Sequence, residues 1–153
     1  MRPTLFAFCA LALLASSVAA APSEGAAVID LKPADGKLPE LLRLQAQRAA
    51  KLHRKPVAEL SAEWCKPCAA IKRYLGDPQM VEAFHEVLLI RLDIDEWPAD
   101  KLDAAGLSTP GVPFFFKLDP SGHATGQKIS SAVWGEDIPA NMAPPLKAFF
   151  AQP

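Results

Sequence analysis

The stretch Ser61-Ala62-Glu63-Trp64-Cys65-Lys66-Pro67-Cys68 contains two cysteines that are separated by two residues. An apolar, strand-like run (residues 56–60) precedes it, and a helix-like run (residues 69–75) follows it. Cysteines with this spacing, placed between a strand and a helix, are typical of a redox dithiol. We therefore expect Cys65 at the end of the strand and Cys68 one turn inside the helix.

The expected position of Cys65 favours its thiolate form. The first N–H groups of a helix lack intrahelical partners, and together with the positive end of the helix dipole they stabilise a negative charge. Pro67 suits the first helical turn, because its missing N–H would have no intrahelical partner there. Cys65 is therefore the expected nucleophile, and Cys68 the less exposed thiol that attacks a mixed disulfide formed by Cys65.

Other uses of this cysteine pair fit the sequence less well. Haem attachment needs a histidine directly after the second cysteine, where this chain has Ala69. A structural zinc site needs four ligands, but there is no second cysteine pair and the histidines (His53, His85 and His123) are scattered. An inert structural disulfide remains an alternative, although cysteines on adjacent turns close a small loop that stabilises a fold little.

The first twenty residues have the pattern of a secretory signal peptide. Arg2 provides a positive charge, residues 5–15 are apolar but too few to span a bilayer, and small residues follow at 16–21. The pattern predicts removal of residues 1–20 and export of the rest, to the periplasm in a Gram-negative bacterium. Cys9 would be lost, which leaves two cysteines in a compartment where disulfides persist.

Length and charge indicate one globular domain. About 130 residues remain after the expected cleavage, enough for a single hydrophobic core. A formal net charge of −1 gives no electrostatic case for binding nucleic acid or an anionic membrane. No other apolar run is long enough to cross a bilayer. We expect an exposed lead-in over residues 21–37 and a folded domain over residues 38–153.

The periodicity of apolar residues alternates between helical and strand-like segments. The expected helices cover residues 38–52, 69–75, 80–84 and 98–105, followed by a last helix with Pro144–Pro145 at its start. The expected strands cover residues 57–61, 87–94, 114–118 and 127–131, and residues 134–145 are expected to be irregular up to the last helix. Such an order predicts a mixed sheet covered on both faces.

Glu59 is unusual within the strand expected at residues 57–61. A carboxylate in a buried strand is costly, so one interpretation places Glu59 in water on an edge strand. The other makes Glu59 a buried acid that moves protons for the cysteine pair six residues further on.

The order of elements from residue 57 to residue 150 resembles the thioredoxin superfamily. Residues 63–68 look like its Trp-Cys-Gly-Pro-Cys active site, with Lys66 in place of glycine. Glu59 occupies the place of the family's buried acid, which favours the second interpretation. Residues 111–113, Gly-Val-Pro, look like the family's loop with a cis-proline opposite the dithiol.

Two further stretches support the resemblance. Residues 114–122 resemble the strand and turn that follow the proline loop in the family. The Asp-Pro-Gln break at residues 77–79 and the helix ahead of the core are most similar to exported thioredoxin-like proteins, those related to the C-terminal domain of the thiol:disulfide interchange protein DsbD.

The resemblance implies an α/β protein with the thioredoxin fold, a mixed central sheet flanked by helices on both faces. It also implies an enzyme, a protein disulfide oxidoreductase, that needs no cofactor or metal because the Cys65–Cys68 pair is the redox centre. Cys65 would attack, Cys68 would resolve the intermediate, and Glu59 would exchange the proton of Cys68. The partners would be protein thiols and disulfides, with a membrane thiol–disulfide protein as a further partner, and we expect a monomer.

The same resemblance implies a substrate-binding surface around the cysteines. Trp64 would shield the sulfurs and form part of an apolar docking surface, with Lys66 and Pro67 beside it. Val112 would offer backbone hydrogen bonds to a bound substrate strand, and Pro113 would keep that face open.

The direction of electron flow is not set by the sequence. A cation at Lys66 should stabilise the Cys65 thiolate and favour an oxidant, whereas the overall similarity favours a reductant or interchange protein. Two alternatives remain: a dithiol oxidase or isomerase of the same fold, and a non-catalytic module that holds a soft metal such as copper(I) between its thiolates. The lack of a Met or His ligand at matching spacing counts against copper.

Overall fold

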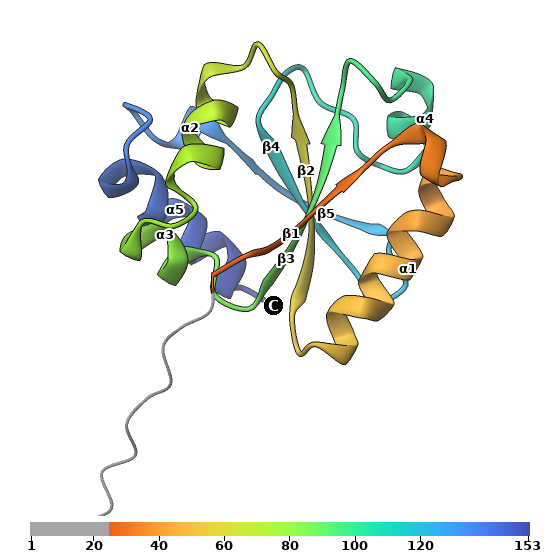
Figure 1. Ribbon diagram of the computed structural model, residues 1–153, viewed down its shortest axis with the longest axis horizontal. Coiled ribbons are helices and arrows are strands. Elements are labelled where there is room, and N and C mark those ends of the chain that lie inside the picture. Colours follow the sequence, from red (N-terminus) through yellow and green to blue (C-terminus); the bar gives the residue numbers. More distant parts are fainter. Residues whose placement is uncertain (1–24) are drawn as a thin grey trace, which may run out of the picture.

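The computed structural model of the protein describes residues 25–153 (Figure 1). Within this part of the chain, five strands form one sheet in the order β1-β3-β2-β4-β5. Their bounds are β1 (Ala27–Leu31), β2 (Lys55–Ser61), β3 (Val87–Asp93), β4 (Phe114–Leu118) and β5 (Ala124–Ser130). The strands β1 and β2 both run parallel to β3, whereas β4 is antiparallel to β2 and to β5. The sheet is therefore mixed, as predicted.

Helices cover both faces of the sheet, which Figure 1 shows edge-on. On one side lie α1 (Leu38–Lys51) and α4 (Ala99–Ala104), and on the other lie α2 (Lys66–Tyr74), α3 (Pro78–Ala83) and α5 (Pro139–Ala151). Two 3-10 turns, η1 (Pro33–Asp35) and η2 (Ser131–Val133), complete the elements of residues 25–153. This strand order and this placement of helices are the predicted thioredoxin fold.

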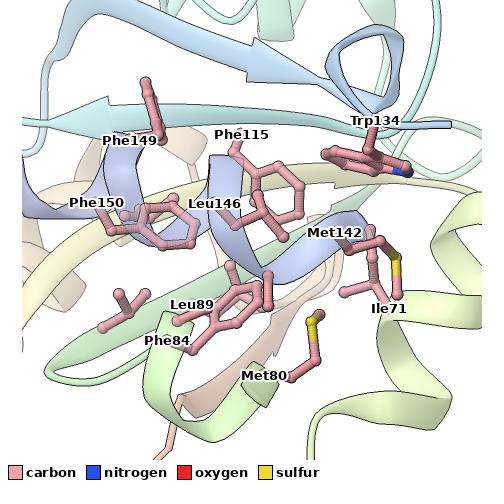
Figure 2. Close-up of a cluster of buried hydrophobic side chains, with 14 of the residues drawn as sticks. Ile71, Met80, Phe84, Leu89, Phe115, Trp134, Met142, Leu146, Phe149 and Phe150 are labelled. Carbon is pink, nitrogen blue, oxygen red and sulfur yellow. The ribbon is translucent and has the colours of Figure 1, made fainter. Parts of the chain in front are cut away.

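Each face of the sheet has its own core, because successive side chains of a strand point to opposite faces. Phe115 of β4 lies in the core beneath α2, α3 and α5, with Phe84 and Phe150 packed around it (Figure 2). Phe116, the next residue, lies in the core beneath α1 and α4. The central strands are thus buried from both sides, which holds the end of β2 and the start of α2 in fixed positions.

The predicted exposed lead-in at residues 21–37 is wrong for part of its length. Residues 27–31 form β1, in which Ile29 lies opposite Ile90 and Leu31 is buried. The strand is hard to recognise because it has only five residues and Val28 and Asp30 are exposed. It pairs with β3 along its whole length, and Ile29 and Leu31 pack in the core on one face of the sheet.

The last helix begins at Pro139, five residues before the predicted start. Pro144 and Pro145 lie inside the helix, where each removes a backbone hydrogen bond. Met142 and Leu146 are fully buried against the sheet, and this packing offsets the lost hydrogen bonds. Residues 139–145 are therefore helical rather than irregular.

The helices of residues 25–153 include none that is long and apolar enough to cross a membrane. The predicted signal peptide over residues 1–20, with Cys9, lies outside the described residues.

Candidate redox site

The two cysteines of the Cys-Lys-Pro-Cys stretch are joined by a disulfide at the start of α2. Cys65 is the N-cap residue, Pro67 lies in the first turn, and the Cα atoms of Cys65 and Cys68 are 5.2 Å apart. The backbone N–H of Cys68 donates to Sγ of Cys65 at 3.2 Å. One of the helix's otherwise unpaired N–H groups therefore points at that sulfur, as expected for a residue whose thiolate is stabilised.

The loop before β4 reaches the disulfide. The Val112–Pro113 peptide bond is cis, as the resemblance implied. Val112 packs against a small cluster that contains Ala62, Cys65 and Cys68. The fold therefore brings this loop, which is remote in sequence, to the sulfurs.

Two exposed side chains flank the disulfide. Trp64 is 65% exposed, and its Nε1 donates to Oδ2 of Asp95 at 2.8 Å. Lys66, the first residue of α2, is also exposed. An apolar ring and a cation thus stand on the surface beside two sulfurs whose residues are each only 4% exposed. Asp95, which orients the ring, was not anticipated from the sequence.

Glu59 is a buried acid, and the edge-strand interpretation of this residue is wrong. It lies in β2, between β3 and β4, and is 1% exposed. Arg91 lies opposite it on β3, and Nε of Arg91 donates to Oε2 of Glu59 at 3.0 Å. Burial raises the pKa of Glu59 above its ordinary value, while the charge and hydrogen bond of Arg91 act in the opposite direction.

Arg91 is a second residue that sequence reasoning missed. The available signal was the alternation of β3, where Arg91 follows Leu89 on the face that the strand buries beneath α2 and α5. A cation on that face requires a buried or half-buried partner, and Glu59 is the matching acid on the neighbouring strand.

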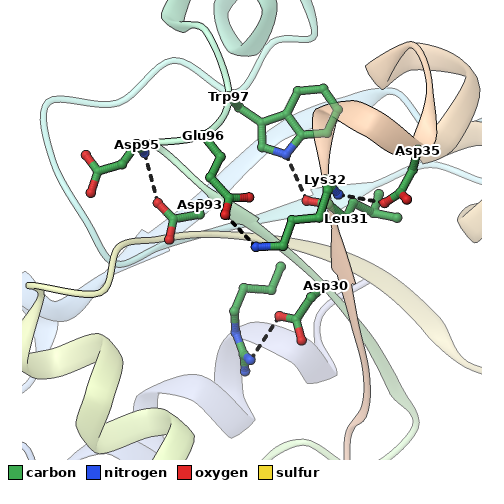
Figure 3. A network of polar contacts seen from close by, with 9 residues as sticks. Asp30, Leu31, Lys32, Asp35, Asp93, Asp95, Glu96 and Trp97 are labelled. Carbon is green, nitrogen blue, oxygen red and sulfur yellow. Dashed lines mark hydrogen bonds and ion pairs between the residues drawn. The ribbon is translucent and has the colours of Figure 1, made fainter.

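A polar pocket of about 250 Å³ opens beside Cys68. The polar side chains that line it include Asp30, Lys32, Ser61, Lys72, Arg91 and Asp93. Figure 3 shows several charged residues near this end of the sheet, among them the pair in which Nζ of Lys32 contacts Oε1 of Glu96 at 2.6 Å. The second cysteine therefore borders a polar space on the side of β1 and β3.

Among residues 25–153, there is no group of three or more His, Cys, Asp or Glu residues that could hold a metal ion.

Comparisons with known proteins find similarity at the level of fold. No protein-family model and no curated protein matches the chain. Poplar thioredoxin h is similar over 67% of this chain and 81% of its own, with 24% identity and a TM-score of 0.47. Oxidised mitochondrial thioredoxin 3 from Saccharomyces cerevisiae is similar over 74% of this chain and 87% of its own, with 22% identity and a TM-score of 0.46.

A thioredoxin mutant from Halobacterium salinarum is similar over more of the chain but with fewer identities. It covers 88% of this chain and 98% of its own, with 14% identity and a TM-score of 0.45. The thioredoxin fold of this protein is defined by its own strand order and helix placement.

Proposed function

We propose that this protein is an exported thiol–disulfide oxidoreductase that exchanges disulfides through Cys65 and Cys68. The observation that carries the proposal is the Cys65–Cys68 disulfide at the start of α2, against which Val112 of the cis-proline loop packs. Glu59, buried in the strand that leads to this helix, supplies an acid for proton exchange.

The exchange proceeds through a mixed disulfide. The Cys65 thiolate attacks one sulfur of a substrate disulfide, and the other substrate sulfur leaves as a thiolate. Cys68 then gives its proton to the Glu59 carboxylate and attacks Sγ of Cys65, which releases the second substrate sulfur. Two electrons pass from the dithiol to the substrate, the Cys65–Cys68 disulfide forms, and the released thiolates take protons from water and from Glu59.

The surface around the disulfide suits an extended segment of a partner protein. The exposed ring of Trp64 offers an apolar contact, and the backbone of Val112 offers hydrogen bonds beside the sulfurs. Pro113 keeps this face open, and Lys66 and Pro67 border it. We propose protein thiols and disulfides as the substrates, and a membrane thiol–disulfide protein as the redox partner.

We further propose that the protein acts as a reductant or interchange protein after export. The sequence of residues 1–20 supports export, to the periplasm if the source is a Gram-negative bacterium. The reducing direction is our inference from residues 77–79 and the helix ahead of the core, which resemble those of exported thioredoxin-like proteins related to the C-terminal domain of DsbD. Formation of disulfides in a reduced substrate protein would indicate a dithiol oxidase instead, and rearrangement of incorrect disulfides would indicate an isomerase.

The deciding experiment is a redox titration of residues 21–153 against glutathione, read by alkylation and mass spectrometry. We expect one two-electron couple, with a potential nearer the roughly −270 mV of a reducing thioredoxin than the roughly −120 mV of a strong oxidant. The Cys65→Ser variant is the matched control and should show no couple. Tight retention of copper(I) without disulfide exchange would overturn the proposal in favour of a metal-binding module.

A further inference from the structure

Three charged residues form a row across neighbouring strands at the redox site. The strand register places Asp30 of β1 and Glu59 of β2 on either side of Arg91 in β3. Nη1 of Arg91 lies 3.2 Å from Oδ1 of Asp30, a contact drawn at Asp30 in Figure 3, and Nε lies 3.0 Å from Oε2 of Glu59. One guanidinium is therefore shared between two carboxylates.

The contact between Arg91 and Glu59 is incomplete. A guanidinium forms its strongest carboxylate pair with two parallel N–H···O bonds, and Nη2 lies on the same edge of the group as Nε. Nη2 of Arg91 and Oε1 of Glu59 are both buried and have no hydrogen-bond partner among the described residues. The guanidinium therefore binds Glu59 through Nε alone, while Asp30 holds Nη1.

The two carboxylates differ in their surroundings. The Asp30 side chain is 60% exposed, whereas that of Glu59 is 1% exposed and depends on protein groups for its stabilisation. The charges that act on Glu59 come from Arg91, from Lys72 of α2, and from Asp30 itself, whose negative charge acts in the same direction as burial. Its partner on β4 is the apolar Phe115.

Two residues of the row and the second cysteine line the same pocket. Asp30, Arg91 and Cys68 all line the polar pocket described above, and Lys72 lines it from α2. The remaining charged residues of that lining are Lys32, Glu63 and Asp93. A change at Asp30 therefore reaches Glu59 through Arg91, on the side of the sheet where Cys68 lies.

We propose that Asp30 is a positioning residue, which holds one arm of Arg91 and so keeps Glu59 a strong enough base to take the proton of Cys68. This inference rests on the proposed function. When Cys68 gives its proton to Glu59 and attacks Sγ of Cys65, Glu59 becomes a neutral acid and later returns the proton to water. A guanidinium bound to both oxygens of Glu59 would favour the carboxylate and weaken it as a base.

The test follows resolution of the mixed disulfide as a function of pH in Asp30→Asn. Reduced protein is mixed in a stopped-flow instrument with the chromogenic disulfide dithionitrobenzoate. Release of its first coloured thiolate reports attack by Cys65, and release of the second reports resolution by Cys68. We expect the midpoint of the resolution profile to move to lower pH and the plateau rate to fall about two- to fivefold. The first release should keep its rate.

Two control variants isolate the contact with Arg91. Asp30→Glu keeps the negative charge and should restore the profile. Glu96→Gln removes a carboxylate from the same end of the sheet, where it pairs with Lys32 instead of Arg91, and should leave the profile unchanged. An unaltered profile in Asp30→Asn would overturn the proposal and show that Asp30 forms only a surface ion pair with Arg91.

A second measurement separates this inference from the proposed function. The side-chain carboxyl carbon of Glu59 can be titrated by ¹³C NMR in the oxidised protein, where no exchange takes place. Its midpoint should move to lower pH in Asp30→Asn, and an unchanged midpoint would refute the role of Asp30. If wild-type protein shows no disulfide exchange while the NMR midpoint moves, the proposed function fails and the Asp30–Arg91–Glu59 coupling stands.

Discussion

The backbone N–H of Cys68 donates to Sγ of Cys65 at 3.2 Å, so the second cysteine of the pair helps to stabilise the first. After reduction the same N–H, at the positive end of α2, faces a thiolate on Cys65. Cys68 lies one turn further into the helix and is not at its N-cap. The geometry therefore distinguishes the two thiols before any substrate binds.

We predict that Cys65 reacts first with an alkylating agent in the reduced protein, because the thiolate is the nucleophile. Cys68→Ser should accumulate mixed disulfides with protein substrates, since the resolving thiol is lost, whereas Cys65→Ser should form none. Peptide mass spectrometry after brief alkylation measures the order, and non-reducing gels measure the trapping. Preferential labelling of Cys68 would reverse the assigned roles.

The charge of Lys66 should make the protein more oxidising, because a cation at the start of α2 favours the reduced, thiolate-containing form. Lys66→Gln should therefore lower the reduction potential by about 5–20 mV, the range expected for an exposed charge pair in a two-electron couple. Lys66→Arg keeps the charge and serves as the control. Equal potentials for all three proteins would mean that solvent screens the charge completely.

The stability of the oxidised protein should depend on the ionisation of Glu59. Burial raises the pKa of Glu59 above 4.5, so the stability associated with its neutral form is complete below about pH 4.5 and is lost as the pH rises through the folded-state pKa. The difference in unfolding free energy between Glu59→Gln and wild type should therefore increase in favour of the variant from about pH 4.5 upward. Urea unfolding at a series of pH values measures it.

Glu82 provides a control with the opposite sign. Its contact with Lys147, at 2.7 Å, lowers the pKa of Glu82 below 4.5, so its contribution to stability is present above pH 4.5 and is lost as the pH falls through the folded-state pKa. Glu82→Gln should therefore lose stability relative to wild type as the pH rises. The same slope in both variants would contradict the assignment of Glu59 as a carboxyl that is costly to ionise.

The turn between β4 and β5 should tolerate no side chain at Gly122. A Cβ there would lie 2.6 Å from the backbone nitrogen of Arg43 in α1, and φ of Gly122 is +87°. Gly126 has the same φ but open space around it. We expect Gly126→Ala to cost about 1 kcal/mol from backbone strain alone, and Gly122→Ala to cost about 2–4 kcal/mol.

The difference between the two glycine variants isolates the close approach of the turn to α1. Urea unfolding of both oxidised proteins measures it, and equal losses would show that the turn can move away from the helix at little cost.

Much of the fold could be predicted because local patterns and tertiary packing agree. Alternation in β3 and the position of Pro67 after Cys65 both match the observed elements. The start of α5 could not be predicted, since buried contacts of Met142 and Leu146 override two prolines that signal a helix boundary.

The candidate site was predictable only where its residues are close in sequence or match a family pattern. Glu59 stood out as an acid in an apolar strand, but its partner Arg91 is set by the register of β2 on β3. The third residue of the row, Asp30, lies in a half-exposed strand that no periodicity revealed. Pairing between distant strands is a property of the folded chain, so it could not be predicted from the pattern of each segment alone.

The row of Asp30, Arg91 and Glu59 also constrains how this sequence can change over evolutionary time. A neutral residue at position 91 would leave a buried carboxylate without its counter-charge, and a neutral residue at position 59 would leave the half-buried cation with only a surface partner. Substitutions at positions 59 and 91 should therefore occur together among homologous chains. Position 30 should keep its acid only in lineages that retain both.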